Sequence, residues 1–162
     1  MAQFINAKED LVTESIDGML RASGDASLAR LDGYPAIKVV LRTGHNGSRV
    51  ALVSGGGSGH EPLHGGFVGT GMLDAAACGE VFTSPVPDQI LAATAGVDGG
   101  AGVLHIVKNY TGDVMNFDMA TEMASFEDIE VRTVLVKDDV ASAPPDEAAR
   151  RRGVAGMVFA FK

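Results

Sequence analysis

The chain has little cysteine, few aromatic residues and no tryptophan. Cys78 is the only cysteine among 162 residues, which excludes an internal disulfide and any metal site built from several cysteines. Beside Ala77, it is expected to be a small buried apolar side chain. Aromatic residues make up only 6% of the sequence, so aliphatic residues and glycine must build the core. Such a composition is typical of layered α/β proteins.

Positive charge is also scarce. The formal net charge is −8 and no run of five basic residues occurs, so nucleic acid is not expected as a partner. The start of the chain lacks a signal-like apolar stretch, and no later run approaches the ~20 apolar residues of a membrane span. Because 46% of the residues are hydrophobic, a chain of this length can bury one sizeable core. We therefore expect a single cytoplasmic domain over residues 1–162, with no membrane contact.

Hydrophobic periodicity predicts alternating helices and strands. Apolar residues at helical spacing predict an amphipathic helix over residues 8–22 and another over 117–126. The segment after Pro62 is compatible with a helix, but its glycines leave the boundaries undefined. Runs of aliphatic and β-branched residues predict strands over residues 36–41, 49–53, 100–107, 131–136 and 154–161. This alternation indicates a three-layer α/β/α sandwich with a largely parallel or mixed sheet.

A glycine-rich segment follows the second predicted strand directly. Residues 54–61 read SGGGSGHE. In open α/β sheets, ligands bind at the carboxyl ends of strands. Four glycines in five residues let the backbone approach a ligand closely, and successive N–H groups can bind an oxygen or an anion. The alternative is a tight strand-to-helix turn without a ligand, and glycine content alone does not distinguish the two.

The glycine-rich segment fits none of the common motifs. A Walker loop needs lysine after its last glycine, where this sequence has His60. The dinucleotide pattern G-x-G-x-x-G would need glycine at His60 or Pro62. The nucleophile motif G-x-S-x-G begins correctly with Gly56 and Ser58 but also breaks at His60. The segment is therefore neither a standard nucleotide site nor a hydrolase elbow.

A second polar segment, KNYTGD, follows the strand predicted over residues 100–107. Lys108, Asn109 and Asp113 at a strand end could bind a polyhydroxy compound and assist proton transfer to or from a hydroxyl. The alternative is a capped loop, in which Asp113 caps the helix that follows and Lys108 is only solvated.

The four histidines differ in their sequence context. His60 lies in the glycine-rich segment beside Glu61, where it could carry a proton or donate a hydrogen bond to a ligand. His64 could share a helical face with His60, but no third ligand has suitable spacing, so no metal site is expected. His105 has apolar neighbours in a strand and is interpreted as a core histidine. His45, in the loop between the first two predicted strands, is interpreted as solvated.

Three long stretches of the sequence resemble a known family. They are VALVSGGGSGHEPLHGGFVGTGMLDAAACGEVFTSPVPDQI, VDGGAGVLHIVKNYTGDVMNFDMA and RRGVAGMVFAFK. With FINAKEDLV near the start, they resemble the N-terminal domain of the dihydroxyacetone-binding K subunit of dihydroxyacetone kinases over nearly the whole chain. The resemblance implies a domain that binds dihydroxyacetone or a related short ketose, which the family holds as a covalent hemiaminal with a histidine.

The resemblance also implies roles for individual residues. The glycine segment at Gly57 and Ser58 would contact the substrate, His60 would bond it near the carbonyl-derived oxygen, and Lys108 would contact a substrate oxygen. Asp113 would bond the hydroxyl to be phosphorylated and accept its proton. No metal or cofactor is expected on this chain, because ATP or ADP with Mg²⁺ would be held by a nucleotide-binding partner subunit or domain. A homodimer is implied as well.

One departure from the family pattern limits these expectations. The covalent histidine of the family lies in a second domain, in a word of the form GxHGEPG, and none of the four histidines here matches it. The chain is therefore expected to supply the first domain alone. Three functions stay open: the substrate-binding part of a kinase for dihydroxyacetone or a four-carbon ketose such as erythrulose, a non-catalytic binding or regulatory module, or an unrelated enzyme, such as an isomerase, that uses His60 and Asp113.

Overall fold

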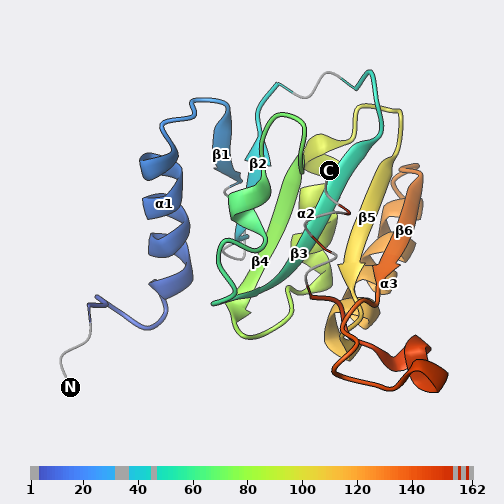
Figure 1. The fold of residues 1–162 in the computed structure, drawn as a ribbon. Helices are drawn as coiled ribbons and strands as arrows, with labels where there is room; N and C mark the ends of the chain where they lie inside the picture. Colours follow the sequence, from blue (N-terminus) through green and yellow to red (C-terminus); the bar gives the residue numbers. More distant parts are fainter. Residues whose placement is uncertain (1–3, 32–36, 45–46, 155–156, 158–159, 161–162) are drawn as a thin grey trace.

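A mixed six-stranded sheet forms the centre of the molecule (Figure 1). The computed structural model describes residues 4–31, 37–44, 47–154, 157 and 160. The strand order is β1-β2-β4-β3-β5-β6. The four strands β4, β3, β5 and β6 run parallel, whereas β1 and β2 are antiparallel and complete one edge. The strands are β1 (Leu28–Leu31), β2 (Val39–Arg42), β3 (Ala51–Ser58), β4 (Ala75–Val81), β5 (Val103–Lys108) and β6 (Val131–Val136).

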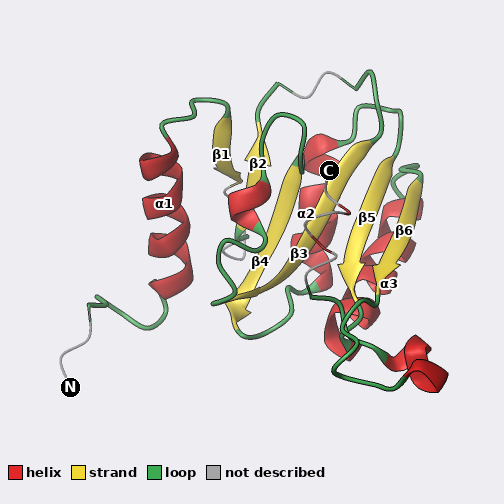
Figure 2. Ribbon diagram, in the orientation of Figure 1, coloured by secondary structure: helices red, strands yellow, loops and turns green. Residues whose placement is uncertain are grey.

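Helices cover both faces of the sheet, so the predicted three-layer α/β/α sandwich is confirmed (Figure 2). The helices are α1 (Leu11–Ser23), α2 (Pro87–Val97) and α3 (Thr111–Ser125), with 3₁₀ turns η1 (Gly65–Phe67) and η2 (Pro145–Arg150). Helices α2 and α3 pack on one face, while α1 and η1 lie against the other. Each face has its own apolar cluster, as expected when a parallel sheet is buried on both sides.

The first helix agrees with its sequence pattern. Val12 and Ile16, one turn apart, are buried against the sheet, and Met19 packs at the edge of the same cluster. The helix ends where Gly24 adopts φ 65°, a left-handed conformation that glycine accepts without strain. The prediction over residues 8–22 was therefore correct within a few residues at its start.

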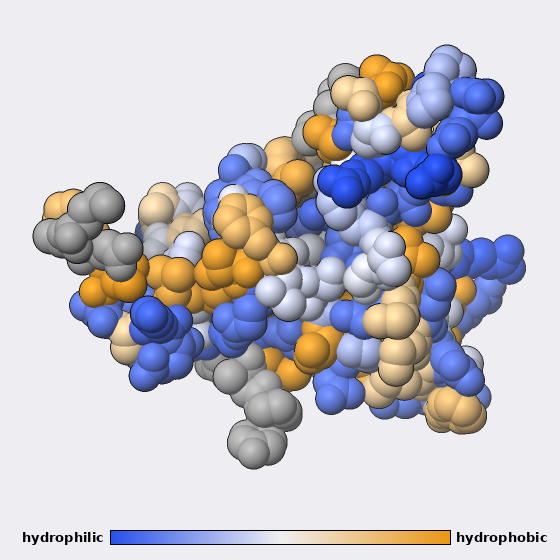
Figure 3. All heavy atoms as spheres, turned by 90° about the horizontal axis from the view of Figure 1, so that it is seen from below, coloured by the Kyte–Doolittle hydropathy of each residue, from blue (hydrophilic) through white to orange (hydrophobic). Residues whose placement is uncertain are grey.

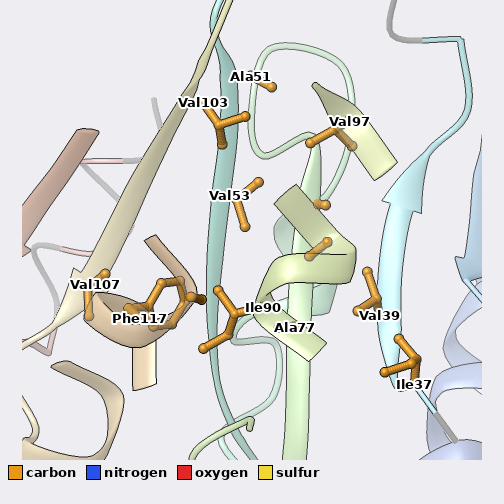
Figure 4. Close-up of a cluster of buried hydrophobic side chains, with 13 residues drawn as sticks. Ile37, Val39, Ala51, Val53, Ala77, Ile90, Val97, Val103, Val107 and Phe117 are labelled. Carbon is orange, nitrogen blue, oxygen red and sulfur yellow. The ribbon is translucent and has the colours of Figure 1, made fainter. Parts of the chain in front are cut away.

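The core between the sheet and helices α2 and α3 is built from aliphatic side chains around one aromatic ring (Figure 4). Phe117 of α3 and Ile90 of α2 are wholly buried. Ala75 and Ala77 of β4 face this cluster, and their short side chains allow α2 to pack closely on the sheet.

His105 is buried in this core, as predicted, with both ring nitrogens close to threonine hydroxyls. Its Nε2 lies 2.8 Å from Oγ1 of Thr94, and its Nδ1 lies 3.3 Å from Oγ1 of Thr121. The Thr94 hydroxyl also donates to the Ile90 carbonyl, and the Thr121 hydroxyl donates to the Phe117 carbonyl. Burial lowers the pKa of His105 to about 4, so the ring is neutral at pH 7.

Two strand predictions failed because composition misled them. The glycines after Val53 were expected to form a loop, but β3 continues through them to Ser58. Parallel pairing with β4 keeps this run extended, with a register shift after Gly57. Strand β4 was not predicted at all, because its run of three alanines favours helix by propensity. Cys78 is buried as expected.

Three other sequence predictions differ from the structure. The short strand β1 was not predicted, and the helix expected over residues 117–126 begins already at Thr111. The strand expected over residues 154–161 was wrong where it can be compared, because Met157 and Ala160 are helical. The rest of that strand, apart from Val154, lies outside the described residues, as do Ala36 and His45. Within the described residues, no helix is long and apolar enough to cross a membrane.

Candidate functional site

The carboxyl ends of β3, β4 and β5 meet at one edge of the sheet, at the lower side of Figure 1. Gly57 and Ser58 end β3, Lys108 ends β5, and Asp113 lies in the first turn of α3. Figure 3 views this face, where residues of intermediate hydropathy lie between hydrophobic and strongly hydrophilic groups. The fold therefore brings together the two polar segments that the sequence singled out, as expected for parallel strands.

Glycine at position 56 is required for the packing beneath this edge. A Cβ atom there would overlap the ring of His64 and lie 2.8 Å from Nζ of Lys108. At Gly57, a Cβ would lie 2.6 Å from the backbone nitrogen of Thr83. The glycines thus let side chains and backbone from three other segments reach the end of β3.

Lys108 and Asp113 form a buried charged pair. Nζ of Lys108 lies 3.8 Å from Oδ2 of Asp113, and the two residues are 5% and 3% exposed. Burial raises the pKa of Asp113, against the opposing effects of a Ser84 hydrogen bond and of the positive charges of Lys108 and His60. Burial likewise lowers the pKa of Lys108, while the charge of Asp113 raises it. The site therefore holds a carboxylate that is a stronger base than an exposed aspartate.

The sequence alternatives for these two residues are both wrong. Lys108 is not solvated but buried, and Nζ lies 5.2 Å from the centre of the Tyr110 ring. Asp113 does not cap the helix, because Tyr110 occupies the N-cap position of α3. As the third residue of α3, Asp113 is instead directed into the site, where the positive end of the helix favours its ionised form.

His60 lies just beyond the end of β3 and is exposed. Its ring packs edge-on against Phe82, with ring centroids 5.0 Å apart. The accessible imidazole can donate or accept a proton at a bound molecule, whereas Asp113 acts from below the surface.

Ser58 is engaged with the backbone. Its hydroxyl donates to the carbonyl of Gly79, 2.7 Å away, so this proton is not available to a ligand. Ser58 nevertheless borders a cavity of about 380 Å³ between β3 and α1, which His64 and Cys78 also line. The Ser58 side chain therefore has a structural role, because its hydrogen bond joins the end of β3 to β4.

His64 is buried, and not on a shared helical face with His60 as considered from the sequence. The residues between them form turns that lead into η1. Burial, together with the charges of Lys108 and His60, lowers the pKa of His64 to about 3, so its ring is neutral. Burial also raises the pKa of the Cys78 thiol to about 12, which leaves it unreactive as a nucleophile.

Sequence reasoning missed the contribution of the segment after β4. Residues 82–85 read FTSP, and Phe82 and Ser84 contact His60 and Asp113 respectively. A signal was present, because small and polar residues follow an alanine-rich run directly. The segment entered the sequence analysis only as part of the family resemblance, and no role was assigned to its residues, because the alanine-rich run before it was not assigned as a strand.

The arrangement combines a recessed base, a buried cation and an exposed imidazole around open glycine backbone. A polyhydroxy ligand could accept hydrogen bonds from Lys108 and the backbone while donating a hydroxyl proton to Asp113. Within the described part of the chain, no three His, Cys, Asp or Glu side chains are grouped so that they could hold a metal ion.

Comparison with known proteins identifies relatives of this chain. Residues 18–162 match the family model described as the Dak1 domain. In Lactococcus lactis, the dihydroxyacetone-binding subunit DhaK of a PTS-dependent dihydroxyacetone kinase is 51% identical over 160 residues. That match covers 99% of this chain and 47% of the subunit, so the chain spans about half the length of this relative.

Two solved proteins have the same fold. The native dihydroxyacetone kinase of Citrobacter freundii superposes with a TM-score of 0.92 at 48% identity, over 99% of this chain and 29% of that one. Its complex with AMP-PNP and Mg²⁺ gives a TM-score of 0.90 at 46% identity, with the same coverage. The dihydroxyacetone kinase operon co-activator DhaQ gives 0.81 at 36% identity, over 92% of this chain and 44% of DhaQ.

Proposed function

Because this chain belongs to the Dak1 domain family, we propose that it is the ketose-binding part of a dihydroxyacetone kinase-type phosphotransferase. Dihydroxyacetone is the first candidate substrate, and a four-carbon ketose such as erythrulose is the second. The observation that carries the proposal is the buried pair of Lys108 and Asp113 beside the open glycine backbone at Gly57. A small polyol with a carbonyl group presents the donors and acceptors that such a site can satisfy.

The proposed roles follow from charge and exposure. The backbone at Gly57 and Ser58 contacts the substrate, and the Lys108 ammonium donates to a substrate oxygen. His60 is exposed and donates a hydrogen bond near the carbonyl-derived oxygen. Asp113 accepts a hydrogen bond from the terminal hydroxyl that receives the phosphoryl group.

In the proposed mechanism, Asp113 acts as a general base. The terminal hydroxyl loses its proton to the Asp113 carboxylate as its oxygen bonds to phosphorus and the bond from phosphorus to the donor's leaving group breaks. The raised pKa of Asp113 strengthens it as a base, and Lys108 stabilises negative charge on the substrate oxygens. Since phosphoryl transfer depends mainly on positioning, fixing the ketose against rigid strand ends supplies much of the rate enhancement.

The phosphoryl donor belongs to a partner in this proposal. Mg²⁺ needs several oxygen ligands, whereas Asp113 is already paired with the positive charge of Lys108. The described site therefore does not fit a metal-bound nucleotide, and ATP or ADP with Mg²⁺ is assigned to a nucleotide-binding subunit or domain. Whether the donor is ATP itself or a phosphotransferase relay depends on that partner.

The proposal treats residues 1–162 as one domain that resembles the first domain of the K subunit. The histidine that forms the hemiaminal would then come from a second domain. His60 and His64 do not lie in a GxHGEPG motif, and His105 is enclosed in the core. A cytoplasmic homodimer completes the proposed assembly, and light scattering of the purified chain would test it.

Titration calorimetry with dihydroxyacetone tests the proposal most directly. Glycerol serves as the control, because it has the hydroxyls without the carbonyl. Saturable binding of dihydroxyacetone, with weaker or no binding of glycerol, is the expected result. Absence of binding by this chain would show that residues 1–162 do not suffice for recognition and would overturn the assignment to this chain.

A second candidate function is a non-catalytic binding or regulatory module. The likeness to the co-activator DhaQ favours it, since a protein with this fold can act outside a kinase. The two functions differ in turnover. Phosphorylation of dihydroxyacetone in the presence of a nucleotide-binding partner supports the first, whereas ketose binding without turnover supports the second.

A further inference from the structure

The segment Phe82–Pro85, which we call the FTSP segment, joins β4 to α2 and contacts both proposed catalytic side chains. Phe82 packs on the ring of His60, and the Ser84 hydroxyl interacts with the Asp113 carboxyl group. These two groups lie on different elements, one after β3 and the other in α3. A single short segment therefore bridges the exposed and the buried halves of the site.

Phe82 has an unusual conformation for an aromatic residue. Its φ is 50°, in the left-handed region that non-glycine residues rarely adopt, and its side chain is 69% exposed. The ring lies edge-on to His60 at an interplanar angle of 80°. It also covers Gly59, where a Cβ would lie 3.0 Å from Cζ of Phe82. An exposed ring held in a strained backbone contributes little to the core, so its contact with His60 needs a functional reason.

Ser84 packs against α3 at Gly112, which has no side chain to block it. A Cβ at Gly112 would lie 2.8 Å from Oγ of Ser84, so the hydroxyl sits against the first turn of α3. Asp113 is the next residue of that turn, and the neighbouring Ser84 hydroxyl lowers the pKa of Asp113. The hydroxyl therefore both holds the carboxylate in place and partly offsets the effect of its burial.

The FTSP segment is itself fixed by backbone contacts. The N–H of Phe82 donates to Ser58 O over 2.8 Å, and Asn116 Nδ2 donates to Pro85 O over 2.8 Å. On the other side, the absence of side chains at Gly57 and Gly79 leaves room for the backbone of Thr83. The segment is thus anchored to β3, β4 and α3 at once, which suits it to hold other groups rigidly.

We propose that the FTSP segment is the positioning element of the site, in which Phe82 orients the His60 imidazole and Ser84 orients the Asp113 carboxylate. This inference rests on the proposed function and extends it. Phe82 and Ser84 act through their neighbours, so they are positioning residues and not catalytic ones. Removing either contact should loosen the neighbouring group while leaving the fold intact.

The Phe82 contact can be tested without substrate. In Phe82→Leu, the ring protons of His60 should lose the ring-current shift that the aromatic edge imposes, as seen by NMR. Phe126→Leu is the matched control, because Phe126 is also exposed and lies at the far end of α3. An unchanged His60 resonance in Phe82→Leu, with the amide spectrum native-like, would overturn the proposal for Phe82.

Dihydroxyacetone affinity then connects the contact to recognition. Phe82→Leu should weaken binding by about 2- to 10-fold, the range of measured edge-to-face contacts, and Phe82→Tyr should restore it. A His60→Ala, Phe82→Leu double variant should bind no worse than His60→Ala alone, because Phe82 acts only through His60. Additive losses would mean that Phe82 contacts the ligand itself and would contradict a positioning role.

The Ser84 contact is read from the titration of Asp113. Ser84→Ala should raise the pKa of Asp113, followed by carboxyl carbon NMR, and Ser84→Thr should return it toward the wild-type value because the hydroxyl is kept. In a reconstituted assay, the acidic limb of the kcat profile should move to higher pH in Ser84→Ala. A profile identical to that of the wild type would overturn the assignment of Ser84.

These results separate the positioning role from the proposed function. If His60 and Asp113 respond to the variants but the wild-type chain binds no dihydroxyacetone, the contacts stand and the proposed function fails. If dihydroxyacetone binds but neither group responds, the function stands and the FTSP segment is only a connection between elements.

Discussion

Nζ of Lys108 and Oδ2 of Asp113 lie 3.8 Å apart at the end of the sheet, with both side chains more than nine-tenths buried. This separation is too long for a good hydrogen bond, yet close enough for strong attraction where water is scarce. A polar ligand atom beside the pair, about 2.8 Å from each of the two atoms, could be contacted by both groups. The pair is therefore better arranged for binding than for stability.

The first prediction concerns Asp113→Asn, which removes the proposed base but keeps the size of the side chain. Dihydroxyacetone binding should stay measurable, while turnover with a nucleotide-binding partner should fall by about 10²- to 10⁴-fold. His60→Ala should instead weaken binding. Calorimetry and a coupled kinase assay on both variants check this, and unchanged turnover in Asp113→Asn would sink the base assignment.

The second prediction concerns an ion pair with a buried carboxylate, at the amino end of β4. Arg49 forms two hydrogen bonds to the wholly buried Asp74, of 2.9 and 2.6 Å, and the Leu52 N–H donates to the same carboxylate. Asp74→Ala leaves the Leu52 N–H and the partly exposed Arg49 guanidinium without this acceptor and should lower the free energy of unfolding by about 1–3 kcal/mol.

Glu130→Ala is the matched control for Asp74→Ala. Glu130 pairs with Arg132 over 3.0 Å, but both side chains are more than two-thirds exposed, so its loss should lower the free energy of unfolding by less than about 1 kcal/mol. Urea denaturation of both variants gives the comparison. Equal losses would mean that burial does not decide the strength of these pairs.

The third prediction concerns the pH dependence of stability. His105 has a folded pKa of about 4, below its ordinary value of 6.5, so the unfolded chain binds the proton more readily. Its stabilising contribution is complete above pH 6.5 and is lost as the pH falls toward 4. Between pH 6.5 and 5 this loss is about 2 kcal/mol, and His64 adds a loss in the same direction.

A His105→Gln variant isolates this contribution. Glutamine can still donate to Thr94 but does not titrate, so the dependence of unfolding free energy on pH between 6.5 and 5 should become shallower. Urea midpoints at both pH values measure the change. A slope as steep as that of the wild type would show that His105 is not protonated on unfolding.

The fourth prediction compares two glycines. A Cβ at Gly79 would overlap Thr83 O and lie 2.7 Å from the nitrogen of Pro85, so Gly79→Ala must displace the FTSP segment. This variant should lower the free energy of unfolding by about 1–3 kcal/mol and weaken dihydroxyacetone binding. Gly18→Ala, in the interior of α1 with nothing within 4 Å, should instead stabilise the chain by about 0.5–1 kcal/mol. Thermal denaturation of both distinguishes the two effects.

The sequence predicted the layers of the fold, and it selected residues that the fold brings together, because both depend on local patterns. The apolar periodicity of α1 and the aliphatic run of β5 can be recognised from the local sequence, without knowing which elements pack beside them. The extended conformation of Gly55–Gly57 is not, since it depends on pairing with a strand more than twenty residues away. The same pairing was needed to recognise β4, whose alanines have no strand preference of their own.

The site residues show the same division. His60, Lys108 and Asp113 were selected because polar residues beside glycine at predicted strand ends can be recognised from the sequence alone. The burial of His64 and the contacts of Phe82 and Ser84 arise only when separate strand ends meet. Sequence reasoning therefore selected the proposed chemical groups more readily than the residues proposed to position them.

Gly57 on β3, Gly79 on β4 and Gly112 on α3 all make room for the FTSP segment. The segment can therefore reach its native position only after two strands and a helix from distant parts of the chain have come together. The complete site therefore exists only in molecules in which these three elements are assembled. A ligand bound there would resist the opening of the whole domain, so binding and global unfolding are thermodynamically linked.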